Sequence, residues 1–162
     1  MTFTFESTVD LPREHVFAFH ERPGNLALLM RRWRAFRMIA HDGLVRVGNV
    51  MRVQERIGIL CLSMTFEHFL YEPPHRFGER LLCGPFRKFE HIHEFEPVGS
   101  GTVVRDLLDI RLPWYPGGEL SMRLLGGARF RRMLAYRHTE LLRLAREGVV
   151  EKAAMSGPHG GG

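Results

Sequence analysis

Cysteines are scarce in this chain of 162 residues, and no uncharged run approaches the length of a membrane-spanning helix. Cys61 and Cys83 lack the close spacing of a zinc or redox motif, and a disulfide scaffold needs more cysteines. The longest uncharged stretch, Ile57–Phe66, is about half of the ~20 residues that cross a bilayer. The first residues also lack the positive start and apolar segment of a signal peptide. We therefore expect a cytoplasmic, reduced protein.

Several catalytic and nucleotide-binding motifs are absent as well. There is no G-x-S-x-G, H-E-x-x-H, G-x-x-x-x-G-K-[ST] or G-x-G-x-x-G motif. Lysine is rare, so that arginine supplies nearly all of the positive charge behind a net charge of +5. No nucleic-acid recognition motif accompanies this charge, and we expect no nucleic-acid partner.

One basic cluster has two interpretations. Arg31, Arg32 and Arg34 surround Trp33, a combination that suits weak contact with an anionic membrane. The alternative is a solvated loop, which is the more common role of a short charged cluster.

Alternating apolar and polar residues predict seven strands. The first spans Thr2–Thr8, where Phe3 and Phe5 share one face. Turn signals rich in glycine, proline and aspartate separate the other six, which is typical of antiparallel strands. The six runs are Arg37–Ala40, Asn49–Ile57, Leu60–Tyr71, Phe77–Leu82, Phe86–Glu96 and Thr102–Leu112.

Helical patterns flank the strands. Two short helices are predicted after the first strand, one carrying Val16 and Phe17 and one over Asn25–Met30. A 3.6-residue period over Glu119–Glu147 predicts a long amphipathic helix with a leucine-rich face. Residues 1–150 therefore form one α+β domain, and residues 151–162 are expected to be a disordered tail. Core positions should include Phe17, Phe66, Phe89, Phe95, Leu134 and Leu141.

Several short motifs, in their order and spacing, resemble the START-like, helix-grip superfamily known as SRPBCC, in particular its bacterial ligand-binding members. These motifs are Val16-Phe-Ala-Phe19 with Pro23, Asn25 and Leu26, Gly84-Pro85-Phe86, His91-x-His93-x-Phe95, Thr102-x-x-x-Asp106 and Tyr136-Arg137-His138. The resemblance implies a curved seven-stranded antiparallel sheet wrapped around the long C-terminal helix, with an apolar cavity between them. It also implies a lipid, sterol, quinone, polyketide or plant hormone as ligand, or, in a minority of members, enzymatic activity. The superfamily has no shared catalytic residues.

Period-two parity places several polar side chains on the inner face of the sheet. In Phe86–Glu96, His91 and His93 share a face with two phenylalanines while the charged residues face outward. The same alternation on the other strands, together with the helical period that places His138 at the centre of its apolar sector, gives an inward polar set of His68, Glu79, His91, His93, Asp106 and His138.

Three interpretations of this set remain open. It can be a buried structural network in which each polar group satisfies another. It can be the polar end of an otherwise apolar ligand pocket with a volume of a few hundred Å³. It can also be a metal site, because His-x-His with a third ligand suits zinc, although the third ligand must come from another strand. We expect no metal and no cofactor.

The predicted function is binding, transport or sequestration of a small hydrophobic or amphipathic molecule in the cavity. Two alternatives are a cyclase or dehydratase that uses His91, His93 and Asp106 in acid/base catalysis, and a protein-interaction module with a filled cavity. The sequence does not indicate an oligomeric state. The predicted ligand-binding residues are Met64, Phe66, His68, Glu79, Phe89, His91, His93, Asp106, Leu134 and His138.

Overall fold

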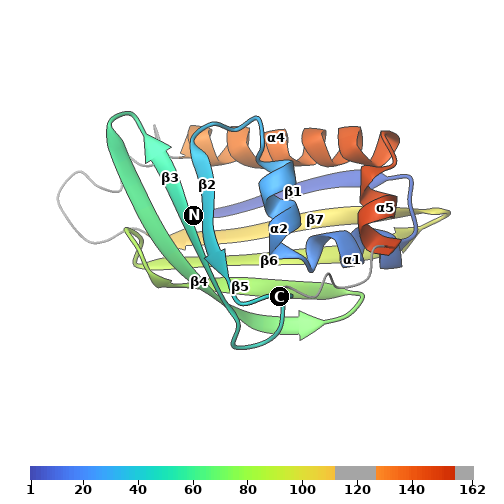
Figure 1. The fold of residues 1–162 in the computed structure, drawn as a ribbon, viewed down its shortest axis with the longest axis horizontal. Coiled ribbons are helices and arrows are strands. Elements are labelled where there is room, and N and C mark those ends of the chain that lie inside the picture. The colour runs from blue at the N-terminus through green and yellow to red at the C-terminus, as the bar shows by residue number, and fades with distance from the viewer. Residues whose placement is uncertain (112–126, 156–162) are drawn as a thin grey trace.

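Seven strands form a single antiparallel sheet in the computed structural model, which describes residues 1–111 and 127–155 (Figure 1). The strand order is β1-β7-β6-β5-β4-β3-β2, so the chain runs as a meander from β2 to β7 and the first strand pairs with the last. The strands are β1 Thr2–Val9, β2 Phe36–His41, β3 Val50–Ile57, β4 Leu60–Glu72, β5 Arg76–Cys83, β6 Lys88–Val98 and β7 Gly101–Arg111.

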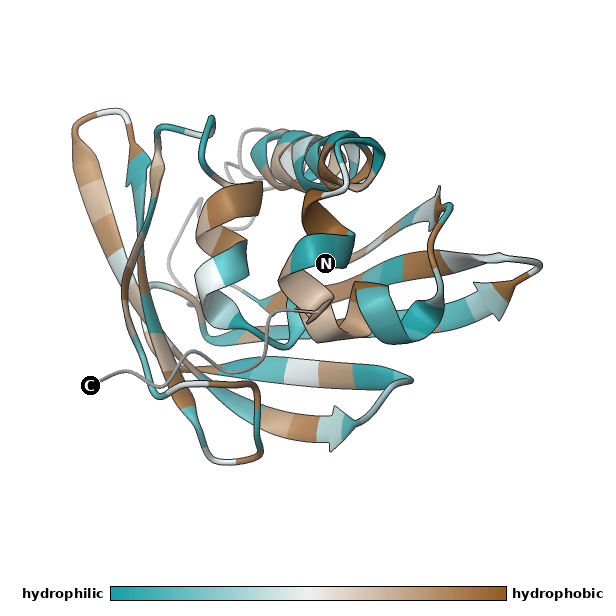
Figure 2. Ribbon diagram, turned by 45° about the vertical axis from the view of Figure 1, so that its right-hand side comes forward, coloured by the Kyte–Doolittle hydropathy of each residue, from teal (hydrophilic) through white to brown (hydrophobic). Residues whose placement is uncertain are grey.

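Four helices of the described residues pack inside the curve of this sheet (Figure 2). The long helix α4 lies along β1, and α1 contacts α5 (Figure 1). None of the described helices is both long and apolar enough to cross a membrane. The helices are α1 Arg13–His20, α2 Pro23–Leu29, α4 Gly127–Arg146 and α5 Val149–Met155.

Strict alternation of burial along β6 and β7 fixes which side chains face inward. On β6, Phe89, His91, His93 and Phe95 are buried, while the intervening residues are partly exposed. Such alternation follows from the pleat, which directs successive side chains to opposite faces. The predicted inner face is confirmed, and all six predicted core residues are buried.

The long helix is confirmed over Gly127–Arg146, and the predicted residues 119–126 lie outside the described part of the chain. It places Leu134, Leu141 and Leu144 against the sheet, which buries its apolar face as the period predicts. This completes the predicted α+β architecture of a curved antiparallel sheet around a C-terminal helix.

The C-terminal boundary differs from the prediction. Residues 151–155, expected to belong to a disordered tail, are the end of helix α5. Gly148 adopts a φ of 69°, which allows the chain to leave α4 and start a second helix. Val150 on α5 is fully buried and anchors this helix in the core, so apolar burial extends the domain beyond residue 150. The rest of the predicted tail, 156–162, lies outside the described residues.

The short helices are tied to each other and to the sheet. Helix α2 begins with Pro23, a residue favoured at the first helical position because its missing N–H has no intrahelical partner there. Asn25 Nδ2 donates a hydrogen bond of 2.8 Å to the carbonyl oxygen of Phe19, near the end of α1. This contact holds the start of α2 beside the end of α1.

The apolar core is divided into two clusters. One contains Phe17 and Phe95, and the other contains Phe66 and Phe89. On β6, β7 and α4 alike, polar residues occupy the positions between the two clusters. We call these residues the polar belt; its members are His68, Glu79, His91, His93, Asp106 and His138, all with exposed fractions of 8% or less.

Candidate functional site

Strand register brings the polar belt together. Glu79 on β5 pairs with His68 on β4 at one side and with His91 on β6 at the other. His93, two residues further along β6, pairs with Asp106 on β7. Neighbouring strands lie about 4.8 Å apart, so side chains at paired positions on one face are within reach of each other.

Asp106 is the centre of the belt because three imidazoles surround its carboxylate. His138 on α4 donates a hydrogen bond from Nε2 to Oδ2 across 3.1 Å. His93 Nδ1 and His91 Nε2 lie 2.5 Å and 3.2 Å from Oδ1. Those two contacts are within ion-pair distance but lack hydrogen-bond geometry, so Oδ1 and both nitrogens have no hydrogen bond among the described residues.

The outer members of the belt are less well paired. His91 Nδ1 lies 3.4 Å from Glu79 Oε1. Both ring nitrogens of His68 are buried without a hydrogen-bond partner in the described part of the chain. An unpaired buried polar group is unfavourable by about 1–3 kcal/mol, so these nitrogens are the members of the belt that would gain most from a further polar partner.

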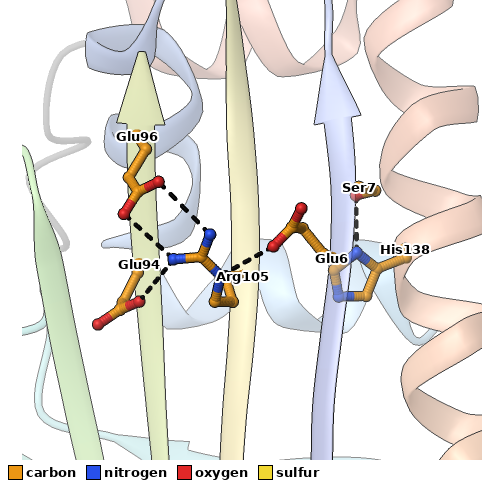
Figure 3. A network of polar contacts seen from close by, with 6 residues as sticks. All are labelled: Glu6, Ser7, Glu94, Glu96, Arg105 and His138. Carbon is orange, nitrogen blue, oxygen red and sulfur yellow. Dashed lines mark hydrogen bonds and ion pairs between the residues drawn. The ribbon is translucent and has the colours of Figure 1, made fainter. Parts of the chain in front are cut away.

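Strand β1 supplies the last contact of the belt. Ser7 donates a hydrogen bond of 2.6 Å to His138 Nδ1, which fixes the tautomer that donates to Asp106 (Figure 3). On the other face of the sheet, Arg105 forms ion pairs with Glu6, Glu94 and Glu96 (Figure 3). That network is solvent-facing and separate from the belt.

The charges within the belt follow from burial and mutual contact. Burial acts to raise the pKa of Glu79, but contact with His91 and the nearby imidazoles lowers it to about 2. Burial also acts against ionisation of Asp106, yet the positive potential of His93, Arg137 and His91 holds its pKa well below the ordinary value. Both carboxylates are therefore ionised near neutral pH.

The pKa values of the two histidines of β6 are shifted in opposite directions. Burial acts to lower the pKa of His91, but Asp106 and Glu79 raise it above its ordinary value. Burial and the neighbouring His91 lower the pKa of His93 to about 3. Near neutral pH His93 is therefore uncharged and keeps a nitrogen lone pair.

A cavity of about 30 Å³ adjoins the belt. Among the described residues this cavity is smaller than the few hundred Å³ predicted, because side chains of α1 and α2 occupy the space over this part of the sheet. The cavity is lined by Phe19, His20, Pro23, Asn25, Leu26, Leu29, Val45, Met51, His68, Phe77, Glu79, His93 and Arg137.

The predicted ligand-binding residues divide into three groups. His68, Glu79 and His93 line the cavity. The belt residues His91, Asp106 and His138 stand beside those three and do not line it. The apolar residues of the prediction pack in or against one core cluster instead; these are Met64, Phe66, Phe89 and Leu134.

Arg137 is the most informative residue that the sequence analysis missed. It lines the cavity, and its Nε is buried without a hydrogen-bond partner among the described residues. The signal was present in the helix period, since Arg137 lies three residues after Leu134 and four before Leu141, both buried.

The basic cluster before β2 remains on the surface. Arg31, Arg32 and Arg34 are exposed, while Trp33 donates a hydrogen bond of 3.0 Å to Glu55 on β3. Arg129 of α4 lies over the Trp33 ring at 5.6 Å. The loop is thus anchored to β3 and α4, and contact of its arginines with an anionic membrane stays a prediction.

The sequence matches a family model described as polyketide cyclase / dehydrase and lipid transport over residues 9–136. This match spans most of the chain, and the chain belongs to that family, within the SRPBCC superfamily. It is therefore a protein of the hydrophobic ligand-binding or cyclase type. No curated protein matches the chain.

Solved structures share the fold. TTHA0849 from Thermus thermophilus superposes with a TM-score of 0.64 at 21% identity, covering 96% of this chain and 100% of the other. The Zhui aromatase/cyclase from Streptomyces sp. R1128 gives 0.66 at 13% identity, covering 92% and 95%. Major latex-like protein 151 from Panax ginseng gives 0.62 at 8% identity, covering 88% and 95%. At these identities the likeness shows the fold, and the predicted helix-grip fold is confirmed.

Proposed function

We propose that the protein binds a small amphipathic molecule in the cavity between α2, the sheet and α4. The observation that carries this proposal is the two-sided lining of the cavity. Leu26, Leu29 and Met51 contribute apolar surface, whereas His68 and Arg137 contribute polar groups that lack partners among the described residues. An apolar ligand body with one polar end matches both sides.

The polar end of the ligand faces Arg137 and His68 in this proposal. A carboxylate, phenol or carbonyl oxygen would accept the hydrogen bond that Arg137 Nε lacks. Fatty acids, quinones and aromatic polyketides all carry such an oxygen on an apolar body. The description of the family, which names lipid transport and polyketide cyclisation, supports this class of ligand.

Ligand entry requires the cavity to expand. A volume of about 30 Å³ has room for water, which needs roughly 10–15 Å³, but is far below the size of a lipid. Helix α2 is the element that we expect to move, because it has seven residues, lacks a side-chain cap and supplies four lining residues. Its displacement would join the cavity to solvent.

A cyclase or dehydratase is the second candidate function. His93 lines the cavity and lies 2.5 Å from Asp106, and a carboxylate beside an imidazole is a pairing that proton transfer commonly uses. His91 is the other proton carrier of this scheme, since its pKa, which burial acts to lower, is raised above the ordinary value by Asp106 and Glu79. Turnover of a polyketide substrate, lost on replacement of His93, would distinguish catalysis from binding.

The test of the proposed function is displacement of an apolar fluorescent probe. The probe should bind to the purified protein and be released by fatty acids, quinones or aromatic polyketides. Absence of binding across such a panel would contradict the proposal and leave the protein-interaction module.

A further inference from the structure

Three side chains with metal-binding atoms converge in the polar belt. Glu79, His91 and His93 each offer one ligand atom, and these atoms lie within 4.8 Å of one another. We propose that they form a binding site for a divalent transition-metal ion, with Zn²⁺ the ion that this donor set fits best. The proposal does not depend on an amphipathic ligand in the cavity.

One pair of donors already has the spacing of a zinc site. His91 Nδ1 and Glu79 Oε1 are 3.4 Å apart. In a tetrahedral site with metal–ligand distances of about 2.0–2.1 Å, neighbouring ligand atoms are about 3.3 Å apart. The donor atom of His93 lies within 4.8 Å of the other two.

Asp106 provides the outer carboxylate that metal-binding histidines usually contact. Its Oδ1 faces His91 Nε2 at 3.2 Å and His93 Nδ1 at 2.5 Å. With these nitrogens protonated toward Asp106, the lone pairs of His91 Nδ1 and His93 Nε2 are left for the ion. A carboxylate in this role fixes the tautomer and strengthens the imidazole as a ligand.

Asp106 is itself held in place by groups that do not bind the ion. His138 occupies its second oxygen at 3.1 Å, and Ser7 orients His138 from β1. The outer layer of the site is therefore contributed by β1, β7 and α4, while the three ligands come from β5 and β6.

The cavity leaves room for a fourth ligand. Its volume of about 30 Å³ exceeds the roughly 10–15 Å³ that a water molecule needs, and Glu79 and His93 form part of its wall. His68 lies across from Glu79 in the same wall, with both ring nitrogens unpaired among the described residues. A metal-bound water in the cavity would give His68 the partner that it lacks.

Charge and donor type favour zinc over a hard cation. Two imidazoles suit Zn²⁺, whereas Ca²⁺ and Mg²⁺ prefer oxygen ligands. Glu79 and Asp106 together balance the charge of a divalent ion, although Arg137 in the cavity wall opposes it. Glu79 would bind the ion directly, which places its negative charge at the metal itself.

The experiment is a metal titration of the full chain without an affinity tag, after removal of metal with a chelator. Zn²⁺ should bind at one ion per chain and raise the melting temperature, and Co²⁺ should give the visible absorption of a tetrahedral site. Glu79→Gln and His93→Asn should abolish the Co²⁺ spectrum. Asp106→Asn should weaken Zn²⁺ binding by about 10- to 100-fold, the usual effect of losing an outer carboxylate.

The matched control is His41→Gln, which removes an exposed histidine far along the sequence from the belt and should leave the titration unchanged. Circular dichroism of each metal-free variant separates a lost ligand from a lost fold, and Glu79→Gln keeps the side-chain size. Absence of stoichiometric binding in the wild-type chain, or unchanged binding in folded Glu79→Gln and His93→Asn, would overturn the site. Probe binding without metal binding would refute the metal site alone. Metal binding without probe binding would refute only the proposed ligand function.

Discussion

His138 Nε2 and Asp106 Oδ2 are joined by a buried hydrogen bond of 3.1 Å, which connects the middle of α4 to the middle of β7. The same imidazole accepts a hydrogen bond from Ser7 on β1. The long helix is therefore fixed against the sheet by a polar contact as well as by leucines. Because polar contacts are directional, this one sets the position of α4 along β1 and with it the place of Arg137 in the cavity wall.

Removing this contact should destabilise the protein. His138→Ala leaves Ser7 and Asp106 without their partner, and we expect the free energy of unfolding to fall by about 1–3 kcal/mol. Urea unfolding followed by circular dichroism measures it. Thr139→Ala is the control on the next, exposed position of α4 and should change stability by less than about 0.5 kcal/mol. Equal stability of the two variants would show that the polar contact does not fix the helix.

Filling the cavity from α2 should block ligand binding. Leu26 lines the cavity, whereas Leu28 on the same helix is exposed. Leu26→Trp should weaken binding of an apolar fluorescent probe at least tenfold, because the larger ring occupies the space that the probe needs. Leu28→Trp should bind as the wild type does. Equal affinities of the two variants would place the probe elsewhere on the protein.

Acid should destabilise the fold through His20. Burial lowers the pKa of His20 to about 4, whereas the unfolded chain has the ordinary value of 6.5. As the pH falls below 6.5, His20 is protonated in the unfolded state but stays neutral in the folded state. The free energy of unfolding therefore decreases as the pH falls from 6.5 to about 4. The loss from this residue at about pH 5 is of the order of 2 kcal/mol.

The measurement is urea unfolding at about pH 7 and pH 5 for the wild type and His20→Gln. Glutamine can still donate to the Val16 carbonyl oxygen, which His20 Nδ1 contacts at 2.8 Å. The variant should lose less stability than the wild type on acidification. An equal loss in both proteins would show that His20 is not responsible.

Two glycines should respond in opposite directions to alanine. At Gly101 a Cβ atom would lie 2.7 Å from the backbone oxygen of Val9, so Gly101→Ala should destabilise the protein by about 1–3 kcal/mol. At Gly24 in α2 nothing lies within 4 Å, and Gly24→Ala should stabilise it by up to about 1 kcal/mol. Thermal unfolding compares the two, and a stabilising Gly101→Ala would contradict the close approach of β1 and β7.

The side chains on the inner face of the sheet could be predicted because their alternation between the two faces is a local property of each strand. Once β6 is a strand with charged residues on one face, His91 and His93 must point to the other. The contacts between belt residues could not be predicted, since they depend on register between strands. A shift of one residue would move Glu79 away from His91 and to the outer face.

The cavity could not be predicted for a different reason. Its size depends on how closely α2 packs on the sheet, which is decided by the shapes of side chains such as Leu29 and Phe77 rather than by any periodic pattern. The helix period indicates that Arg137 faces inward, but only the position of α4 in the fold places it in the cavity wall. The extension of the domain into α5 also had no local sequence signal. It results from the packing of Val150 against the core.

Native mass spectrometry of the protein purified without denaturation tests the central claim, ligand binding in the cavity, most directly. The wild type and Leu28→Trp should carry a small apolar molecule that organic extraction removes, and Leu26→Trp should carry none. A wild-type chain that has only its sequence mass, and that takes up no fatty acid, quinone or aromatic polyketide when these are added, would contradict the account.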